Sequence, residues 1–196
     1  MARRINTAYI FILILLISVI LSQFGTNEVV YFKSEIDSQL YLVRNLPDKQ
    51  KASDFLAILK RNIFQLVNHL ETNIDNYADH KKYINQLIKN IKHVDIKESG
   101  EGSVYTSYIV NKGEEIFFCL RSKKNYNKFH NLNLIMYVAL HELAHVATPE
   151  FGHTPLFKSN FQFLTLEAIK LKLYTKIDFD NDPKEYCGLM VSDSIV

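Results

Sequence analysis

The chain has 196 residues, of which 47% are hydrophobic and 22% are charged. Those fractions are typical of a folded globular protein and exclude wholesale disorder. Of the 23 Lys and Arg residues, Arg3 and Arg4 precede an apolar N-terminal stretch, so the remaining 21 basic residues balance the 21 acidic ones. A domain without net charge has no general electrostatic attraction to nucleic acid, which makes nucleic acid a disfavoured partner.

Residues 1–25 are predicted to form a membrane anchor. Arg3 and Arg4 come before an almost entirely apolar segment from Ile5 to Phe24, and a helix of about 20 apolar residues can cross a bilayer. A cleaved signal peptide has the same layout, but the Ser-Gln-Phe-Gly sequence that follows matches a small-residue cleavage site poorly. The arginines favour a single-pass protein with a cytoplasmic N-terminus and the rest of the chain on the far side of the membrane.

Residues 26–103 are predicted to be a mainly helical N-terminal part. Apolar residues such as Leu56, Leu59, Ile63 and Leu66 recur at helical spacing, which indicates a long amphipathic helix. The elements expected here are a strand over 40–43, a helix from about Pro47 to Thr72, a helix over 79–91 and a flexible connection over 99–103.

Residues 104–196 are predicted to form the second domain, which begins with a β-hairpin. Its strands are expected over 105–110 and 115–120, and Gly113 lies in the polar turn between them, where glycine tolerates a positive φ. An exposed edge of such a hairpin can hydrogen-bond an extended peptide as an added strand.

A metal-binding pattern, His-Glu-Leu-Ala-His, occupies residues 141–145 within a nearly continuous apolar run over 134–147. A helix turns about 100° per residue, so the imidazoles of His141 and His145 lie on one face. Unpaired polar groups are costly in a buried helix, and a metal ion is the simplest partner for both imidazoles. Glu142 lies beside the first ligand, where it can take a proton from a metal-bound water.

The segment after this helix supplies a candidate third ligand. A catalytic zinc site usually has three protein ligands and leaves a fourth position for water. His153 is the favoured candidate, because Gly152 lets the loop turn back and Pro155 then begins another helix. Glu167 is the competitor, since it lies on that next helix, predicted over 155–173, and zinc also accepts carboxylate ligands.

Two further histidines are not predicted to bind the metal, and the two cysteines leave two states open. His69 is interpreted as a surface or core residue of its helix and His130 as a solvated loop residue. A final strand is predicted over 186–191. Cys119 and Cys187 can form one disulfide in an oxidising compartment, but two buried thiols fit the sequence at least as well.

From the metal helix onward, the sequence resembles the WLM and SprT-like (Spartan-related) metalloproteases. Their pattern is H-E-x-x-H, a short loop, and then a His with an aromatic residue four positions later; His153 and Phe157 match the second part. The preceding hairpin and the Tyr186-Cys-Gly ending are also similar to WLM-type metallopeptidases encoded by large DNA viruses. The resemblance covers residues 105–191, and its Gly-His-Thr-x-x-Phe part is more specific than the widely shared H-E-x-x-H part.

This resemblance implies an α+β, zincin-like metallopeptidase domain, in which a metal-binding helix pair lies under a small antiparallel sheet. By residue match it implies that His141, His145 and His153 bind Zn²⁺ and that Glu142 is the catalytic acid/base. Relatives cleave proteins, and some act on proteins crosslinked to DNA.

The favoured hypothesis is a membrane-anchored zinc metalloprotease with a protein or peptide substrate. In this mechanism Glu142 assists the attack of a zinc-bound water on the peptide bond and delivers the proton to the leaving amine. Tyr105, Tyr108 and Tyr186 are candidates for a transition-state donor, among which the sequence does not choose.

Two alternatives come from other functional classes. A DNA-associated protease acting on DNA–protein crosslinks requires a basic face, for example around Lys123, Lys124 and Lys128. A non-catalytic zinc-binding domain is disfavoured, because Glu142 is not a ligand and has little structural reason to lie beside two.

Overall fold

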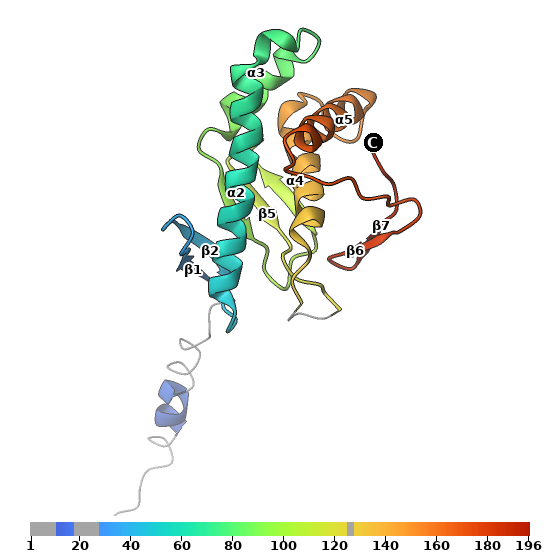
Figure 1. Ribbon diagram of the computed structural model, residues 1–196. Helices are drawn as coiled ribbons and strands as arrows, with labels where there is room; N and C mark the ends of the chain where they lie inside the picture. Colours follow the sequence, from blue (N-terminus) through green and yellow to red (C-terminus); the bar gives the residue numbers. More distant parts are fainter. Residues whose placement is uncertain (1–10, 18–27, 125–127) are drawn as a thin grey trace, which may run out of the picture.

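The computed structural model describes residues 11–17, 28–124 and 128–196 (Figure 1). The elements in chain order are β1 (Val29–Lys33), β2 (Leu40–Arg44), α2 (Lys49–Thr72), the short 3₁₀ helix η1 (Ile74–Asn76), α3 (Lys81–Ile91), β3 (Asp95–Glu98), β4 (Ser107–Val110), β5 (Glu115–Phe118), α4 (Leu132–Ala147), α5 (Pro155–Lys170), β6 (Lys184–Tyr186) and β7 (Leu189–Val191).

The membrane anchor predicted for Ile5–Phe24 falls largely outside the described residues, which include only 11–17 of it, in a helix. Within the described ranges, no helix combines the length and the apolar character needed to span a bilayer. The anchor therefore stays a prediction from the sequence.

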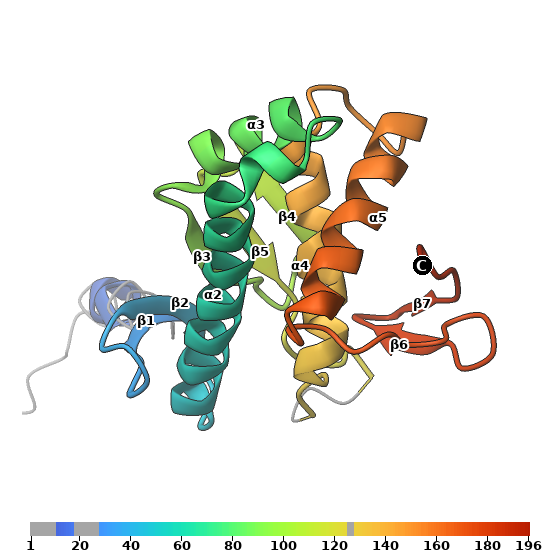
Figure 2. The ribbon, with the colours of Figure 1, turned by 45° about the horizontal axis from the view of Figure 1, so that its top comes forward.

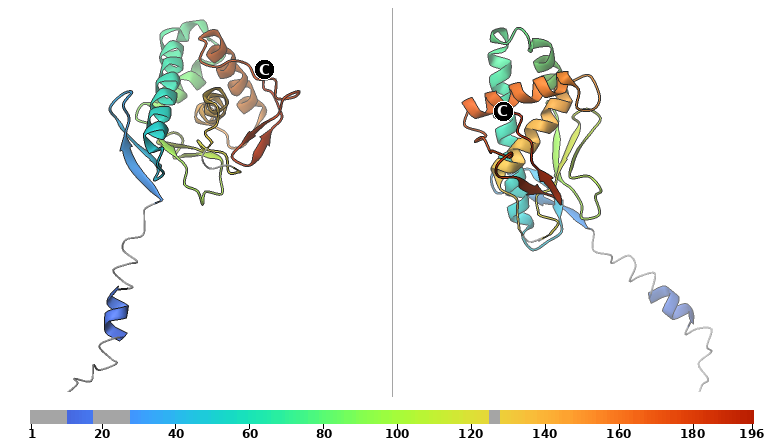
Figure 3. Two further views of the ribbon diagram at one scale, coloured as in Figure 1. Left: turned by 60° about the horizontal axis from the view of Figure 1, so that its bottom comes forward. Right: turned by 90° about the vertical axis from the view of Figure 1, so that its right-hand side faces the viewer.

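Helix α4 lies at the centre of the protein and contacts α2, α3, α5 and β4. Figure 3 shows it nearly end-on in the left view, between α2 and α5. Its apolar character on every face matches this position, because a helix enclosed on all sides has no polar face. From Leu134 to Ala147 every side chain is buried except those of His141 and His145. The metal-binding pattern is thus the one opening in an otherwise enclosed helix segment.

The sheet beside α4 has the strand order β3-β5-β4, in which β4 pairs antiparallel and β3 parallel with β5. The expected small sheet is present, but the prediction that it is antiparallel was wrong, because it omitted β3. The β4–β5 hairpin itself is as predicted, and its turn has positive φ at Asn111, Lys112 and Gly113. Within the described residues β4 is an end strand with one unpaired edge.

Residues from both sides of the division predicted at residue 103 share one sheet and one hydrophobic cluster. Strand β3 comes from the part predicted to be mainly helical, yet it pairs with β5. A single hydrophobic cluster also includes Leu56, Ile116 and Leu140, which come from both sides of that division. The prediction also omitted the β1–β2 hairpin.

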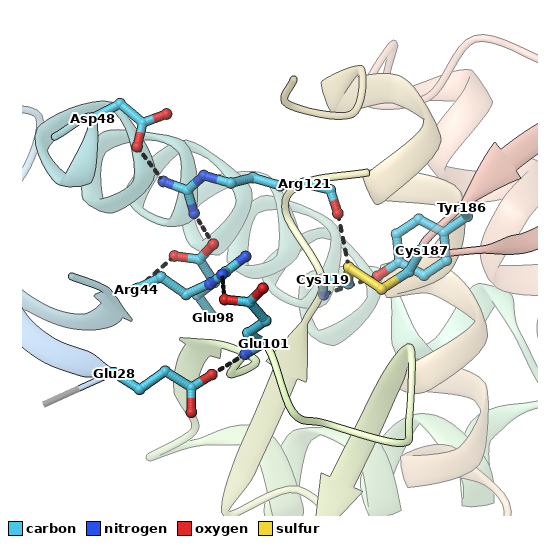
Figure 4. A network of polar contacts seen from close by, with 9 residues as sticks. All are labelled: Glu28, Arg44, Asp48, Glu98, Glu101, Cys119, Arg121, Tyr186 and Cys187. Carbon is cyan, nitrogen blue, oxygen red and sulfur yellow. Dashed lines mark hydrogen bonds and ion pairs between the residues drawn. A yellow bond between two sulfur atoms is a disulfide. The ribbon is translucent and has the colours of Figure 1, made fainter. Parts of the chain in front are cut away.

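A buried network of charges joins the N-terminal hairpin to the sheet (Figure 4). The Arg121 guanidinium, whose side chain is 1% exposed, pairs with Glu98 and also with Asp48 at 2.7 Å. Arg44 of β2 pairs with Glu101 at 2.5 Å. Because buried charges are tolerated only when they are paired, this network fixes the start of α2 against β3. It also explains why Asp48 makes no side-chain capping bond to that helix.

The chain ends in a hairpin rather than in the single strand predicted over 186–191. Strands β6 and β7 pair antiparallel, and Cys187 and Gly188 turn between them with φ of 51° and 90°. Cys187 forms a disulfide with Cys119, which follows β5. Figure 2 shows the hairpin on the side of α4 that faces away from α2. The disulfide, drawn in Figure 4, attaches the turn of this hairpin to the segment that follows β5.

Candidate metal centre

Three histidines converge beside α4. One nitrogen each from His141, His145 and His153 lies within 4.8 Å of the corresponding nitrogen of the others. The Nε2 atom of His141 is 3.2 Å from that of His145 and 3.1 Å from that of His153. A tetrahedral zinc ion with bonds of about 2.0–2.1 Å requires nitrogens about 3.3 Å apart. The donor set and its spacing therefore fit a zinc ion.

The ends of the two helices bring His153 back to His141. Thr148 stops α4, and its hydroxyl donates to the Ala144 carbonyl at 2.7 Å while accepting from the Asn160 amide at 3.0 Å. The loop then turns at Gly152, where φ is 80°, a region that favours glycine. Thr154 next caps α5, accepting the Phe157 N–H at 3.2 Å.

Phe157 is the aromatic residue four positions after His153, and its ring contacts all three imidazoles. Its centroid is 4.2 Å from that of His145, 5.0 Å from that of His141 and 4.8 Å from that of His153. The ring is 2% exposed. Phe157 therefore restrains the three imidazoles and excludes water from behind them, which gives the sequence pattern a physical reason.

Burial keeps two of the imidazoles neutral. Desolvation, reinforced by His145 and His153, lowers the pKa of His141 to about 3. Desolvation, with smaller contributions from His153 and Lys112, lowers the pKa of His145 to about 4. At neutral pH both rings therefore carry a free lone pair, which is the state that a metal ligand needs.

Glu142 lies on the same helix, and its side chain is buried with one hydrogen-bond partner. The Ser107 hydroxyl, from the start of β4, donates to Oε1 of Glu142 at 2.5 Å. Desolvation raises the pKa of Glu142 to about 7, although the Ser107 hydrogen bond opposes the shift. A carboxyl group whose pKa is near neutrality can both take up and release a proton. Sequence reasoning missed Ser107, because nothing in its own segment indicates a contact 35 positions away.

Glu167, the competing ligand, lies elsewhere. Its buried carboxylate accepts from the Tyr77 hydroxyl at 2.7 Å and from Lys170 at 2.5 Å, and it is 3.6 Å from His69. These contacts tie α5 to α2 and to the segment after η1, outside the group of three histidines. His69 is thus part of a structural cluster, as expected.

The other residues considered from the sequence are His130 and the three tyrosines that are candidate transition-state donors, and they differ in burial. His130 is buried rather than solvated, and its Nε2 accepts the Cys187 N–H at 3.2 Å. Tyr105 is 65% exposed, and Tyr108 stacks on Phe117. Tyr186 is buried, and its hydroxyl accepts the Cys119 N–H at 3.1 Å. The pKa of the Tyr186 hydroxyl is raised, and burial is the main cause.

Two cavities with different linings open beside the histidines. The first, of about 570 Å³, includes His141, His153 and Tyr137 in its lining, and we call it the Tyr137 cavity. The second, of about 510 Å³, includes His145, Glu142 and Phe151, and we call it the Phe151 cavity. Both volumes lie in the range of ligand pockets, about 300–1,000 Å³.

The chain has viral relatives of similar length. It is 43% identical over 192 residues to a protein of Acanthamoeba polyphaga mimivirus, which covers 98% of this chain and 96% of that protein. A protein of Invertebrate iridescent virus 6 is 39% identical over 69 residues, covering 35% of this chain and 38% of the relative.

The model of the WLM domain matches residues 108–189, the part that contains the three histidines and Glu142. Among solved structures, Wss1 from Saccharomyces cerevisiae is similar with a TM-score of 0.43 and 18% identity, over 65% of this chain and 84% of that one. From the domain match and the full-length viral similarity, we conclude that the chain belongs to the WLM family.

Proposed function

We propose that this protein is a zinc-dependent metallopeptidase that hydrolyses peptide bonds in protein substrates. The observation that carries the proposal is the convergence of three imidazoles, two of them held neutral, beside a helix that also carries a buried glutamate. A purely structural metal site would be closed by a fourth protein ligand. Within the described residues the group has only three members, and two cavities open beside it.

The chain's own residues supply most of the mechanism. When bound by the three histidines, zinc lowers the pKa of a coordinated water and polarises the carbonyl of the peptide bond. Glu142 takes the proton of the attacking water and delivers it to the leaving amine. Ser107 holds one carboxylate oxygen, which leaves the other to accept the proton of the attacking water.

Metal removal and restoration test this function. The full chain in detergent should cleave an unfolded protein, lose that activity after dialysis against a chelator, and regain it with stoichiometric zinc. Calcium or magnesium should not restore it, because those ions prefer oxygen ligands to imidazole. Zinc binding without cleavage would instead support the non-catalytic alternative.

Ser107 is expected to be a positioning residue for Glu142. Ser107→Ala should lower kcat about 10-fold, equivalent to about 1.4 kcal/mol, because the carboxylate loses the bond that orients it. KM and zinc content should change little, since Ser107 is not a ligand. Ser107→Thr keeps the hydroxyl and should restore most of kcat. Equal losses in both variants, measured by steady-state kinetics, would show that the hydroxyl has no such role.

We also propose that residues 1–25 anchor the enzyme in a membrane, with the peptidase domain on the far side. Arg3 and Arg4 before the apolar segment support this orientation. The Cys119–Cys187 disulfide also supports it, because disulfides persist in oxidising compartments and are rare in the cytosol.

Extraction and protection experiments test the location. The full chain should resist alkaline carbonate, whereas residues 26–196 should be released as soluble protein. In intact vesicles, added protease should not reach the domain. The domain should also bind duplex DNA weakly, because each phosphate contact needs a positioned Lys or Arg. A full chain that carbonate removes, with tight and salt-sensitive DNA binding, would favour the DNA-associated protease.

A further inference from the structure

The surface that lines the Tyr137 cavity is mainly apolar, although Ser107, His141 and Tyr186 also line it. Tyr137 and Phe161 are buried in its lining, at 7% and 5% exposure, and Val138 of α4 lies beside them. The charged residues in the lining, Lys158 and Asp193, are both exposed. Such a surface gains free energy by enclosing an apolar group, and neither of its two charged side chains is buried to pair with a charged one.

The outer wall of this cavity comes from the last hairpin and the segment after it. Leu189 and Met190 of β7 contribute to the lining, although they are 62% and 58% exposed. The following segment is fixed at its back, where the Tyr137 hydroxyl donates to the Asp193 carbonyl at 3.2 Å and Ser194 accepts the Phe179 N–H at 3.1 Å. Large apolar side chains exposed beside a cavity commonly mark a binding surface.

The direction of strand β4 indicates which end of a bound peptide lies at which cavity. Its unpaired edge can take an extended peptide as an added strand, and antiparallel pairing is the commoner and slightly more stable arrangement. Ser107, at the start of β4, lines the Tyr137 cavity, whereas Ile109 and the following Asn111 line the Phe151 cavity. A peptide antiparallel to β4 therefore has its C-terminal part at the Tyr137 cavity.

We propose that the Tyr137 cavity binds the side chain directly after the scissile bond, and that the enzyme prefers a large apolar residue there. This inference rests on the proposed peptidase function and adds its substrate class: peptide bonds that precede Phe, Leu, Met or Tyr. The volume of about 570 Å³ exceeds the needs of one side chain, so the cavity also receives the residues that follow it.

Two matched variants test the assignment. Val191 of β7 and Ile109 of β4 are half-buried β-branched residues that line the Tyr137 and Phe151 cavities, respectively. Each is replaced by Trp in the zinc-loaded full chain, and cleavage sites in a peptide library are identified by mass spectrometry. Zinc content and thermal unfolding of both variants should match the wild type before their specificities are compared.

The wild type should cleave before Phe or Leu at least 10-fold faster than before Ala, within the range that hydrophobic pockets achieve. Val191→Trp should lower kcat/KM about 10- to 100-fold for bonds before Phe and less than about threefold for bonds before Ala. Ile109→Trp should keep the preference after the bond and change only the residues accepted before it.

Several results would overturn the assignment. One is a wild type that cleaves without regard to the residue after the bond; another is loss of that preference in Ile109→Trp but not in Val191→Trp. If no peptide is cleaved at all, the peptidase proposal fails separately. In that case, the binding of a fluorescent Phe-containing peptide to zinc-loaded Glu142→Gln protein tests whether the cavity is the binding site. Adding Val191→Trp to this protein should weaken peptide binding about 10-fold. Unchanged binding would reject the cavity as the site.

Discussion

Replacing Glu142 with Gln is expected to lower kcat by about 10²- to 10⁴-fold, the range associated with loss of a general acid–base group. The amide has nearly the same shape and keeps an oxygen that can accept from Ser107, so the fold should persist. It cannot take a proton from the attacking water, however, and the reaction loses both of its proton transfers. Peptide cleavage and zinc content, measured on the same preparation, check this expectation.

Glu71→Gln is the matched control for that experiment. Glu71 is exposed near the end of α2, away from the three histidines, and the same change of a carboxylate to an amide there should leave kcat unaltered. Cleavage at the wild-type rate by Glu142→Gln would remove Glu142 from the mechanism. A loss of zinc in that variant would instead indicate that the carboxylate supports the metal site.

His153→Ala is expected to weaken zinc binding far more than Glu167→Ala. Removing one of three ligands should exceed the roughly 10- to 100-fold loss that follows removal of a group that only supports a ligand. Glu167 contacts Tyr77 and Lys170 instead, so its replacement should lower the thermal unfolding temperature without releasing metal. Zinc titration with a competing chelator distinguishes the two effects.

The opposite result would reverse the ligand assignment. If Glu167→Ala released zinc while His153→Ala retained it, the metal would have to lie beside α5, away from the site formed by His141 and His145. His153→Asn provides a second variant, since its side chain resembles imidazole in polarity but is a weak zinc ligand. It should behave like His153→Ala in the titration and like the wild type in thermal unfolding of the metal-free protein.

The sequence predicted those parts of the fold whose signals are local. The spacing of apolar residues located α2, and the uniform apolar character of 134–147 indicated that α4 is enclosed. The start of α5 was also readable, because the helix begins at Pro155 as predicted. All of these features depend on residues within about one helical turn of each other.

Strand β3 was missed because its burial depends on distant charges. Its sequence is Asp-Ile-Lys-Glu, with a single apolar residue, so no strand pattern is visible. Lys97 and Glu98 are nevertheless buried, since Lys97 pairs with Glu115 and Glu98 with Arg121. Only the folded chain brings these partners together, and a hydrophobicity pattern cannot register an ion pair.

The same distinction holds for the candidate site. His141 and His145 follow from helical spacing alone, and the short loop with Gly152 indicated that His153 could return to them. The contact of Ser107 with Glu142 instead joins a strand to a helix, and the Tyr137 cavity depends on a hairpin that the sequence suggested only as one strand.

The disulfide has a consequence for how the protein would withstand the proposed peptidase activity. Cys119 and Cys187 are 68 positions apart and enclose α4, the loop with Gly152 and α5, hence all three histidines and Glu142. Phe151 projects from that loop with 86% exposure, the most accessible aromatic ring beside the site. If one molecule cuts another there, both fragments stay covalently joined through the sulfur atoms. Such a nicked molecule would migrate as a single band until a reductant is added, and its ligands would remain close enough to reassemble.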